Sequence, residues 1–230
     1  MRVVVRADAR CGEHGDHESG HCAAGLDPKK QSLRASERKE AVRTAWRAAI
    51  TPVRPEDLVF VDETGSHLGY TPTHAWAPRG QRAVASAPRN QGENKTVVAA
   101  LTLAGIGPRM RFDGAMTAAR FDLYIRHCLA PTLRPGQVVV ADNLTAHHVP
   151  SVRAAIEARG AELRHLPAYS PDFNPIEEAF SKVKQSLRRA QPRTEDDLRT
   201  ATWAAFNTIT PTDAAGWFTH CGYVPLAQSL

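Results

Sequence analysis

Three acidic residues stand at positions where a folded chain gathers functional side chains. Asp62 and Asp142 each directly follow a short apolar run, and Glu177 is the third residue of a helix predicted to open at Asn174 and Pro175. In an α/β sheet, ligand-binding side chains collect at the ends of adjacent central strands. We therefore expect two strand ends and one helix start to bring these three carboxylates into one cleft.

Three carboxylates in a small cleft repel one another, and no Lys or Arg directly adjoins them in the sequence. Two divalent cations would relieve this repulsion, and Mg²⁺ in particular prefers a few carboxylate ligands together with water and phosphate oxygens. Two such ions about 4 Å apart can activate one oxygen and stabilise the leaving oxygen of a phosphodiester. The pattern thus predicts two Mg²⁺ ions held by Asp62, Asp142 and Glu177, and phosphodiester chemistry.

Each acidic residue also has a purely structural interpretation. Asp62 and Asp142 are suitable turn residues after a strand. Glu177 fits a capping box with Asn174, in which the two side chains satisfy the backbone at the helix start. Glu178 is expected to point to solvent, about 200° from the apolar face at 3.6 residues per turn. The order, context and spacing of all three together favour the functional interpretation.

The elements that must position these residues follow from the apolar pattern and from the turn residues. We expect a strand at 58–61, a hairpin at 75–84, a strand at 95–103, a turn at 105–108 and a strand at 109–112. Next come a helix at 117–133, a strand at 138–141, a helix at 152–159 ended by Gly160, and a strand at 163–166. A Pro-rich loop leads to the Glu177 helix, whose buried face is Ile176, Phe180, Val183 and Leu187. A last helix follows, capped by Thr194 and carrying Leu198, Ala205, Phe206 and Ile209.

An initial strand meander followed by alternating helices and strands is typical of a layered α/β fold with a mixed sheet. Ribonuclease-H-like architecture, in which helices flank such a sheet, has this order. We divide the chain into a disordered tail at 1–28, a basic helical linker at 29–55 and a catalytic domain with C-terminal helices at 56–230. Within the linker, Val42, Trp46 and Ala49 recur at helical spacing, with Ser36 as the expected N-cap.

Three segments resemble the DDE transposases of bacterial insertion sequences, in the Tc/mariner superfamily. They are VDETG at 61–65, VVADNLTAH at 139–147 and YSPDFNPIEEAF at 169–180, with 34 residues between Asp142 and Glu177, a spacing that this superfamily favours. The resemblance extends from about residue 29 to about residue 225. It implies a ribonuclease-H-like fold, Mg²⁺ or Mn²⁺ at Asp62, Asp142 and Glu177, and DNA strand cleavage and transfer without a covalent protein intermediate.

The chain departs from this family at its start. Such transposases usually carry helix-turn-helix domains ahead of the catalytic domain, whereas only 28 residues precede Lys29 here. We expect a separately encoded helix-turn-helix part, with a homodimer on DNA as a further family expectation. The alternative, from a different functional class, is a truncated, inactive remnant that binds DNA or a full-length transposase as a regulator.

Basic residues cluster in two places that could hold the DNA backbone. The predicted DNA-binding residues are Lys29, Lys30, Arg34 and Arg38 before the domain, and Lys182, Lys184 and Arg188 beyond Glu177. Contacts of this kind give salt-dependent affinity and little sequence choice. The alternative for both clusters is a solvated or ion-paired surface.

Several other polar and aromatic residues have weaker signals. Asn143 and His147 are expected around the carboxylates, His147 near the scissile phosphate, although a structural histidine is an equal alternative. Trp76 could stack on a base, but a core position is the commoner outcome for tryptophan. Two cysteines and three histidines within 11–22 match no zinc-finger spacing, and we assign them to an unstructured tail.

Composition sets broad limits. The chain has 230 residues, 42% of them hydrophobic and 23% charged, which excludes collagen-like, coiled-coil and wholly disordered classes. No run of 18 apolar residues suggests a membrane span, and the start lacks a secretory signal pattern. The formal net charge of +5 permits a nucleic-acid partner without requiring one. We expect a cytoplasmic, nucleoid-associated protein.

Overall fold

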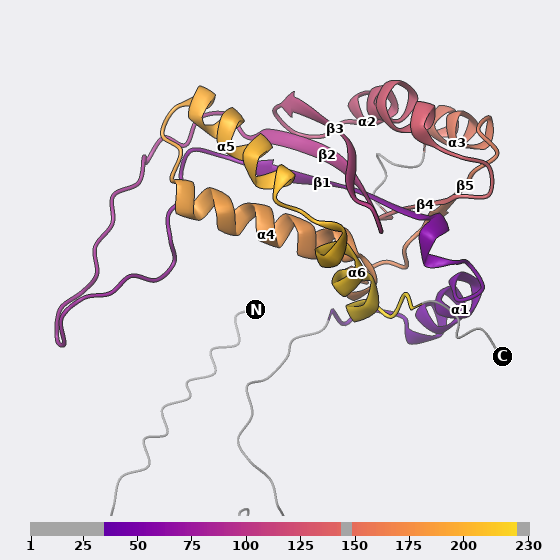
Figure 1. Ribbon diagram of the computed structural model, residues 1–230, viewed down its shortest axis with the longest axis horizontal. Helices are drawn as coiled ribbons and strands as arrows, with labels where there is room; N and C mark the ends of the chain where they lie inside the picture. The colour runs from indigo at the N-terminus through magenta and orange to yellow at the C-terminus, as the bar shows by residue number, and fades with distance from the viewer. Residues whose placement is uncertain (1–34, 144–148, 225–230) are drawn as a thin grey trace, which may run out of the picture. The chain divides into compact units, whose positions relative to one another are not determined.

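A five-stranded mixed sheet forms the centre of the fold (Figure 1). The structure is a computed structural model that describes residues 35–143 and 149–224. The strands lie in the order β3-β2-β1-β4-β5, and β2 runs antiparallel to both of its neighbours, whereas β1, β4 and β5 are parallel. Their bounds are β1 Leu58–Ser66, β2 Lys95–Thr102, β3 Gly105–Asp113, β4 Val138–Ala141 and β5 Glu162–His165.

Helices cover both faces of this sheet, as Figure 1 shows. They are α1 Glu40–Ile50, α2 Ala118–Tyr124, α3 Pro150–Glu157, α4 Pro175–Ala190, α5 Glu195–Asn207 and α6 Pro211–His220. Side chains alternate along β1, so Leu58 and Phe60 pack with α4, α5 and α6, while Val59 and Val61 pack with α2 and α3. Two apolar layers therefore sandwich the sheet, and the predicted α/β fold with a mixed sheet is confirmed.

The predicted order of elements holds best where the sheet is buried on both sides. All four residues of β4 are buried, as expected for its apolar run. In α4, the four predicted core residues Ile176, Phe180, Val183 and Leu187 are each at most 2% exposed. The helix ends at Gln191, which takes the left-handed conformation that often follows a helix C-terminus.

Several predicted boundaries were wrong. Strand β1 continues five residues past 58–61, because β2 pairs with it as far as Ser66. The predicted turn at 105–108 belongs to β3, and the reversal of direction lies just before it, around Leu103 and Ala104. The expected single helix at 117–133 is three short pieces, α2 followed by a π-helical turn and a 3₁₀ turn, with Pro131 inside the last. Lys39 rather than Ser36 precedes α1 as its N-cap residue.

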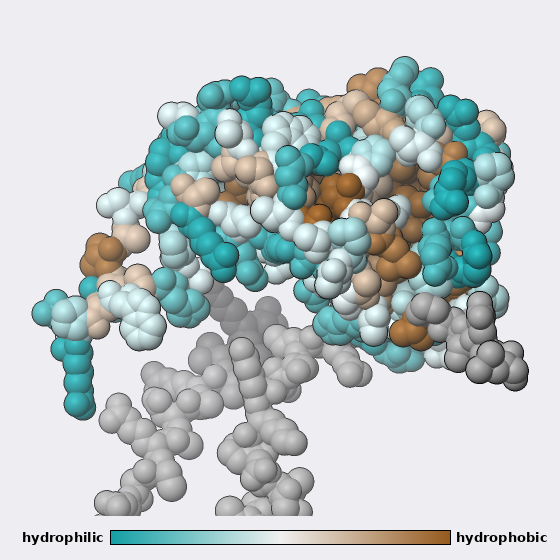
Figure 2. Space-filling view, in the orientation of Figure 1, coloured by the Kyte–Doolittle hydropathy of each residue, from teal (hydrophilic) through white to brown (hydrophobic). Residues whose placement is uncertain are grey.

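The segment between β1 and β2 is an extended arm, not the predicted hairpin. It contains no strand, and every residue from 72 to 87 is exposed. Trp76 on this arm is fully exposed, so the core position expected for it was wrong. Figures 1 and 2 show the arm standing clear of the sheet and helices. Its two ends are held at the domain by Arg193, which donates hydrogen bonds to the backbone oxygens of Tyr70 at 2.9 Å and Ser86 at 3.2 Å.

A helix beyond the expected last one completes the fold. Thr194 caps α5 as predicted, accepting from the Asp197 backbone amide, but Ile209 lies after the end of that helix. The additional helix α6 begins with a complete capping box between Thr210 and Asp213. In the described ranges, none of the helices combines the length and apolar character that crossing a bilayer requires.

Candidate active site

Strand register places Asp62 and Asp142 side by side. Strands β1 and β4 pair in parallel, with Val61 opposite Ala141, so the next residues on each strand are the two aspartates. Adjacent strands lie about 4.8 Å apart. Asp62 is not after its strand, as the sequence suggested, but inside β1 where pairing with β4 stops. The pairing of β1 with β2 continues past this point, so Asp62 is held in extended backbone and is only 6% exposed.

Glu177 reaches the same region from the first turn of α4. A 3₁₀ turn, Pro171–Phe173, leads into Asn174, and Pro175 opens the helix at its first position. The predicted capping box is not formed, because the Asn174 side chain makes no cap hydrogen bond. Instead the Asn174 amide donates to Asp62 Oδ2 at 2.8 Å. The purely structural interpretation of Glu177 as a capping-box residue is therefore wrong.

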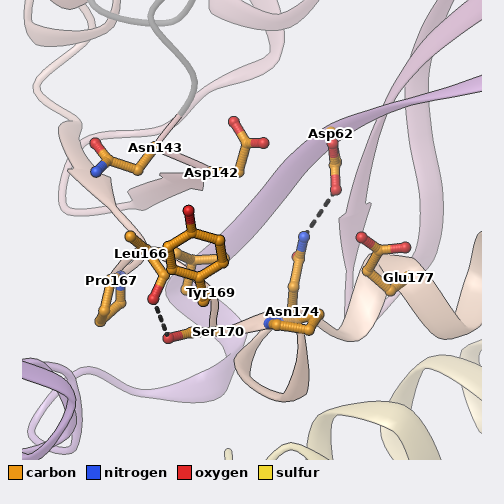
Figure 3. Close-up of a pocket in the computed structure, with 11 residues that line it drawn as sticks. Asp62, Asp142, Asn143, Leu166, Pro167, Tyr169, Ser170, Asn174 and Glu177 are labelled. Carbon is orange, nitrogen blue, oxygen red and sulfur yellow. Dashed lines mark hydrogen bonds between the residues drawn. The ribbon is translucent and has the colours of Figure 1, made fainter. Parts of the chain in front are cut away.

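All three carboxylates line one cavity of about 410 Å³ (Figure 3). Asn143 and Asn174 add amide groups to the wall, and the loop after β5 closes the other side. The loop residues that line the cavity are Leu166, Pro167, Ala168, Tyr169, Ser170 and Pro171. The structure thus brings together residues from β1, β4 and α4 that are separated by 80 and 35 positions in the chain.

Neighbouring carboxylates in this cavity raise one another's pKa. Burial, and to a smaller degree the neighbouring carboxylates of Glu177, Glu63 and Asp142, raise the pKa of Asp62 to about 8. Partial burial also raises the pKa of Glu177, against a lowering by the Lys184 ammonium. Each carboxylate therefore makes the ionised form of its neighbours less favourable. A cation in the cavity would remove this penalty.

The chemistry of the donor set fits a hard divalent cation. Carboxylate and amide oxygens are the ligands that Mg²⁺ and Mn²⁺ prefer. In residues 35–143 and 149–224, however, no three His, Cys, Asp or Glu side chains converge closely enough to hold an ion between them. The carboxylates share a cavity wall rather than a point, so the Asp142 and Glu177 side chains would have to rotate toward an ion bound at Asp62.

The remaining predicted residues around the site have distinct positions. Asn143 lines the cavity at its exposed edge, and His147 lies outside the described residues. Glu178, expected in solvent, is half-buried with its Oε1 3.4 Å from His220 Nδ1. These placements put Asn143, but not Glu178, on the wall of the cavity.

The three predicted basic residues of α4 do not share one environment. Lys184 lies two helical turns after Glu177, and its ammonium charge lowers the pKa of the Glu177 carboxylate. Arg188 lies one turn further along α4, with its guanidinium carbon 5.9 Å from the centre of the Tyr70 ring. Lys182 faces α6 instead, where its Nζ contacts Asp213 at 2.6 Å and the Thr208 backbone oxygen at 3.0 Å. Of these three residues, Lys184 and Arg188 therefore extend a basic row from the cavity along α4.

Of the four predicted basic residues before the domain, the structure describes only Arg38. Lys29, Lys30 and Arg34 lie outside the described residues, as does the Cys- and His-rich segment 11–22. Arg38 pairs with Glu40 at 2.7 Å and lies 3.8 Å from Asp172. It therefore contributes to the junction between α1 and the turn that precedes α4.

Sequence reasoning missed two residues of the cavity. Asn174 was expected only as a helix cap, and its pairing with Asp62 spans 112 positions, which no local pattern can reveal. Tyr169, which the sequence placed only in the family motif at 169–180, lines the cavity with a backbone φ of 57° and an exposed ring. An aromatic residue in this left-handed conformation is strained, and strain of this kind clusters at functional sites.

Comparison with known families and structures decides the assignment. The family described as DDE superfamily endonuclease matches residues 57–199, a span that contains all three carboxylates. The chain belongs to this family. No curated protein matches the chain.

Solved structures of the transposase Mos1 have the same fold as this domain. The chain resembles Mos1 in its strand transfer complex with a TM-score of 0.60 and 16% identity, over 87% of this chain and 63% of that one. It resembles the isolated catalytic domain of Mos1 mariner transposase with a TM-score of 0.55 and 14% identity, over 85% and 91% of the two chains. The expected ribonuclease-H-like fold is thus confirmed. The chain spans less than two thirds of the length of Mos1 in the strand transfer complex.

Proposed function

We propose that this DDE endonuclease domain is the catalytic part of a transposase that cuts and joins DNA strands during the movement of a bacterial insertion sequence. The observation that carries the proposal is the meeting of Asp62, Asp142 and Glu177 from β1, β4 and α4 on the wall of one cavity. Family membership over residues 57–199 and the likeness to Mos1 support it.

Asp62, Asp142 and Glu177 would hold two Mg²⁺ or Mn²⁺ ions. When bound, such ions supply activation of the attacking oxygen and stabilisation of the leaving oxygen of a phosphodiester. Mos1 structures have been determined as paired end complexes with Mn and with Mg. The backbone of this chain holds the site in place, because Asp62 lies in β1 where that strand is still paired with β2, and Glu177 lies in the first turn of a 16-residue helix. His147 would act near the scissile phosphate and Asn143 beside Asp142.

DNA is the proposed partner, both the ends of the element and its target. Lys184 and Arg188 would contact the backbone beside the cavity, with Lys182 nearby on α4 once its contact with Asp213 is exchanged. Lys29, Lys30, Arg34 and Arg38 would hold the DNA that enters from the linker at 29–55. These contacts fix position rather than sequence.

Recognition of the element ends would come from a helix-turn-helix part encoded separately. Two copies of the chain would assemble on a pair of DNA ends, since Mos1 is found in a paired-end complex with the left transposon end. Segment 1–28 is proposed as a tail and segment 56–230 as the catalytic unit. The proposed location is the cytoplasm, in association with the nucleoid.

The proposal is tested by removing one carboxylate. The substrate is a duplex carrying the inverted repeats that flank the coding sequence, incubated with the full chain, its helix-turn-helix partner and Mg²⁺. We expect Asp142→Asn to reduce strand nicking by more than about a hundredfold, because loss of an outer-shell group alone costs ten- to a hundredfold. Asp196→Asn, at the exposed start of α5, makes the same charge change away from the site and should nick normally. Equal nicking by Asp142→Asn and the wild type would discard the mechanism.

The alternative role, an inactive remnant that regulates by binding, is less well supported. Decay of an active site removes the pressure to keep its acidic residues, yet all three carboxylates are present and line one cavity. A remnant would bind the repeat duplex but leave it uncut in Mg²⁺. The nicking experiment therefore separates the two roles.

A further inference from the structure

We infer that Asn174 is a positioning residue that sets the orientation of the Asp62 carboxylate for metal binding. This inference rests on the proposed function, because it assigns a role in the same site. The inference is based on a direct contact between two buried residues. Asn174 Nδ2 donates a hydrogen bond of 2.8 Å to Asp62 Oδ2. Figure 3 shows this bond, with Glu177 following on the same helix.

Both oxygens of Asp62 are held by hydrogen bonds from the protein. The Glu63 backbone amide donates to Oδ1 at 2.7 Å, and Asn174 donates to Oδ2. Two donors on the two oxygens fix the plane of the carboxylate as well as its position. Each oxygen keeps a second lone pair for an ion, since a carboxylate can accept at about four sites. This is the arrangement of an outer-shell group that orients a metal ligand.

Asn174 gives up its ordinary structural role to make this contact. It is the N-cap residue of α4, a position where asparagine normally accepts a hydrogen bond from the helix backbone. Its side chain makes no such bond, and among the described residues its Oδ1 is buried without any partner. A buried unpaired oxygen is unfavourable unless something else satisfies it. The wall position of Asn174 in the carboxylate cavity makes a water of a hydrated ion the fitting donor.

The turn that carries Asn174 is fixed from two other parts of the chain. Arg43 of α1 forms a two-point contact with Asp172 at 2.6 and 3.1 Å, and Tyr223 donates to the Phe173 backbone oxygen at 2.6 Å. The guanidinium carbons of Arg43 and Arg47 each lie 3.9 Å from the centre of the Phe173 ring. The Asn174 amide is therefore presented to Asp62 by a rigid support, as positioning requires.

The test separates positioning from helix capping. Asn174→Ser keeps a good N-cap residue but is too short to reach Asp62. Thr194→Ser, at the N-cap of α5, is the matched control because it exchanges one good cap residue for another away from the cavity. For each full-length protein, Mn²⁺ affinity is measured from the spin resonance of free Mn²⁺, kcat and KM from nicking, and stability from urea unfolding.

We expect Asn174→Ser to bind Mn²⁺ about ten- to a hundredfold more weakly, with a lower kcat and an unchanged KM for DNA. Its urea midpoint should stay near that of the wild type, and Thr194→Ser should match the wild type throughout. Wild-type Mn²⁺ affinity and kcat in the folded Asn174→Ser variant would overturn the inference, as would a weakening that only follows a loss of folded protein. If the wild type itself neither binds Mn²⁺ nor nicks the repeat duplex, the proposed function fails as well, and the two failures are thereby distinguished.

Discussion

Asp62 is the residue at which the fold and the proposed chemistry conflict most. It is buried inside a strand, and burial together with three neighbouring carboxylates raises its pKa to about 8. In the unfolded chain an aspartate releases its proton near pH 4. Between these pH values the folded protein without metal holds a proton that the unfolded chain has released. Its stability therefore falls as pH rises through this window.

Removing the charge of Asp62 should stabilise the metal-free protein. In excess chelator we expect Asp62→Asn to raise the free energy of unfolding by on the order of 2 kcal/mol at pH 8. This gain in unfolding free energy should be absent below pH 4, grow up to pH 8 and then level off, because the pKa of Asp62 is raised in the folded state. Urea unfolding at a series of pH values checks this. A gain that does not change with pH would contradict the electrostatic origin.

The three carboxylates of the cavity could be predicted because each is marked by its neighbours in the sequence, whereas the contact with Asn174 could not. Asp62 and Asp142 follow apolar runs and Glu177 follows an Asn-Pro helix start. These are properties of neighbouring residues. The contact between Asn174 and Asp62 depends on how β1 and α4 pack, so it appears only in three dimensions. The raised pKa of Asp62 has the same origin.

At the scale of elements, an ion pair between Arg43 and Asp172 joins α1 to the 3₁₀ turn before α4, and its two side chains are buried to different extents. The Arg43 side chain is 5% exposed, whereas that of Asp172 is 49% exposed. Burial raises the pKa of Asp172, but the hydrogen bonds and charge of Arg43 outweigh this effect and lower it overall. Deleting the Asp172 side chain therefore leaves the buried Arg43 charge behind, whereas deleting the Arg43 side chain leaves the solvated charge of Asp172.

The two deletions should therefore differ in cost. We expect Asp172→Ala to lower the free energy of unfolding by about 2 kcal/mol, because among the described residues the buried Arg43 then keeps Glu40, at 3.3 Å, as its one carboxylate partner. Arg43→Met, which keeps an apolar chain against Phe173, should cost less. Urea unfolding of the two variants at neutral pH measures the difference. Equal costs would mean that the burial of Arg43 is not what matters.

A second prediction at this scale concerns the start of α6. Hydrogen bonds from Lys182 and then from the Thr210 amide and hydroxyl lower the pKa of Asp213 to about 2. A lowered pKa stabilises the fold above the unfolded value near 4, and that stabilisation disappears as pH falls toward 2. We expect Asp213→Ala to cost about 1 kcal/mol at pH 7 and clearly less near pH 2, where about half of the Asp213 carboxylates are protonated. Thermal unfolding at both pH values checks this, and an equal cost at both would exclude the charge as its source.

The sequence predicted the bounds of an element where a cap residue or an apolar face marks them. It missed the bounds that depend on pairing with a distant strand. The cap residue Thr194 and the apolar face of α4 predicted correct helices. The end of β1 depends on β2, which lies about 30 residues further on, so an apolar run alone placed it too early. The arm at 72–87 carries turn residues of a hairpin, but no strand of the sheet pairs with it.

At the scale of the whole molecule, basic side chains form a continuous route from the cavity to the arm. The Lys184 charge lowers the pKa of Glu177, and Arg188 lies near the Tyr70 ring. Arg193 donates hydrogen bonds to the backbone oxygens of Tyr70 and Ser86 at the two ends of the arm. On the arm, Arg79, Arg82 and Arg89 form no salt bridge with any described residue. The formal charge of +5 does not reveal this clustering, which depends on where the chain puts its arginines.

This route predicts how DNA affinity depends on salt. Removing one phosphate-binding side chain lowers the slope of log affinity against log salt by about 0.9, so replacing Arg79, Arg82 and Arg89 by Gln should lower it by nearly 3. Affinity for a random-sequence duplex is measured by fluorescence anisotropy from about 50 to 200 mM salt. The matched control replaces Arg126, Arg153 and Arg199 by Gln, which removes three exposed arginines already paired on helices. We expect a much smaller change in the control, because those guanidinium groups are neutralised by neighbouring carboxylates. An equal change in both triple variants would show that net charge, and not the arm, attracts the DNA.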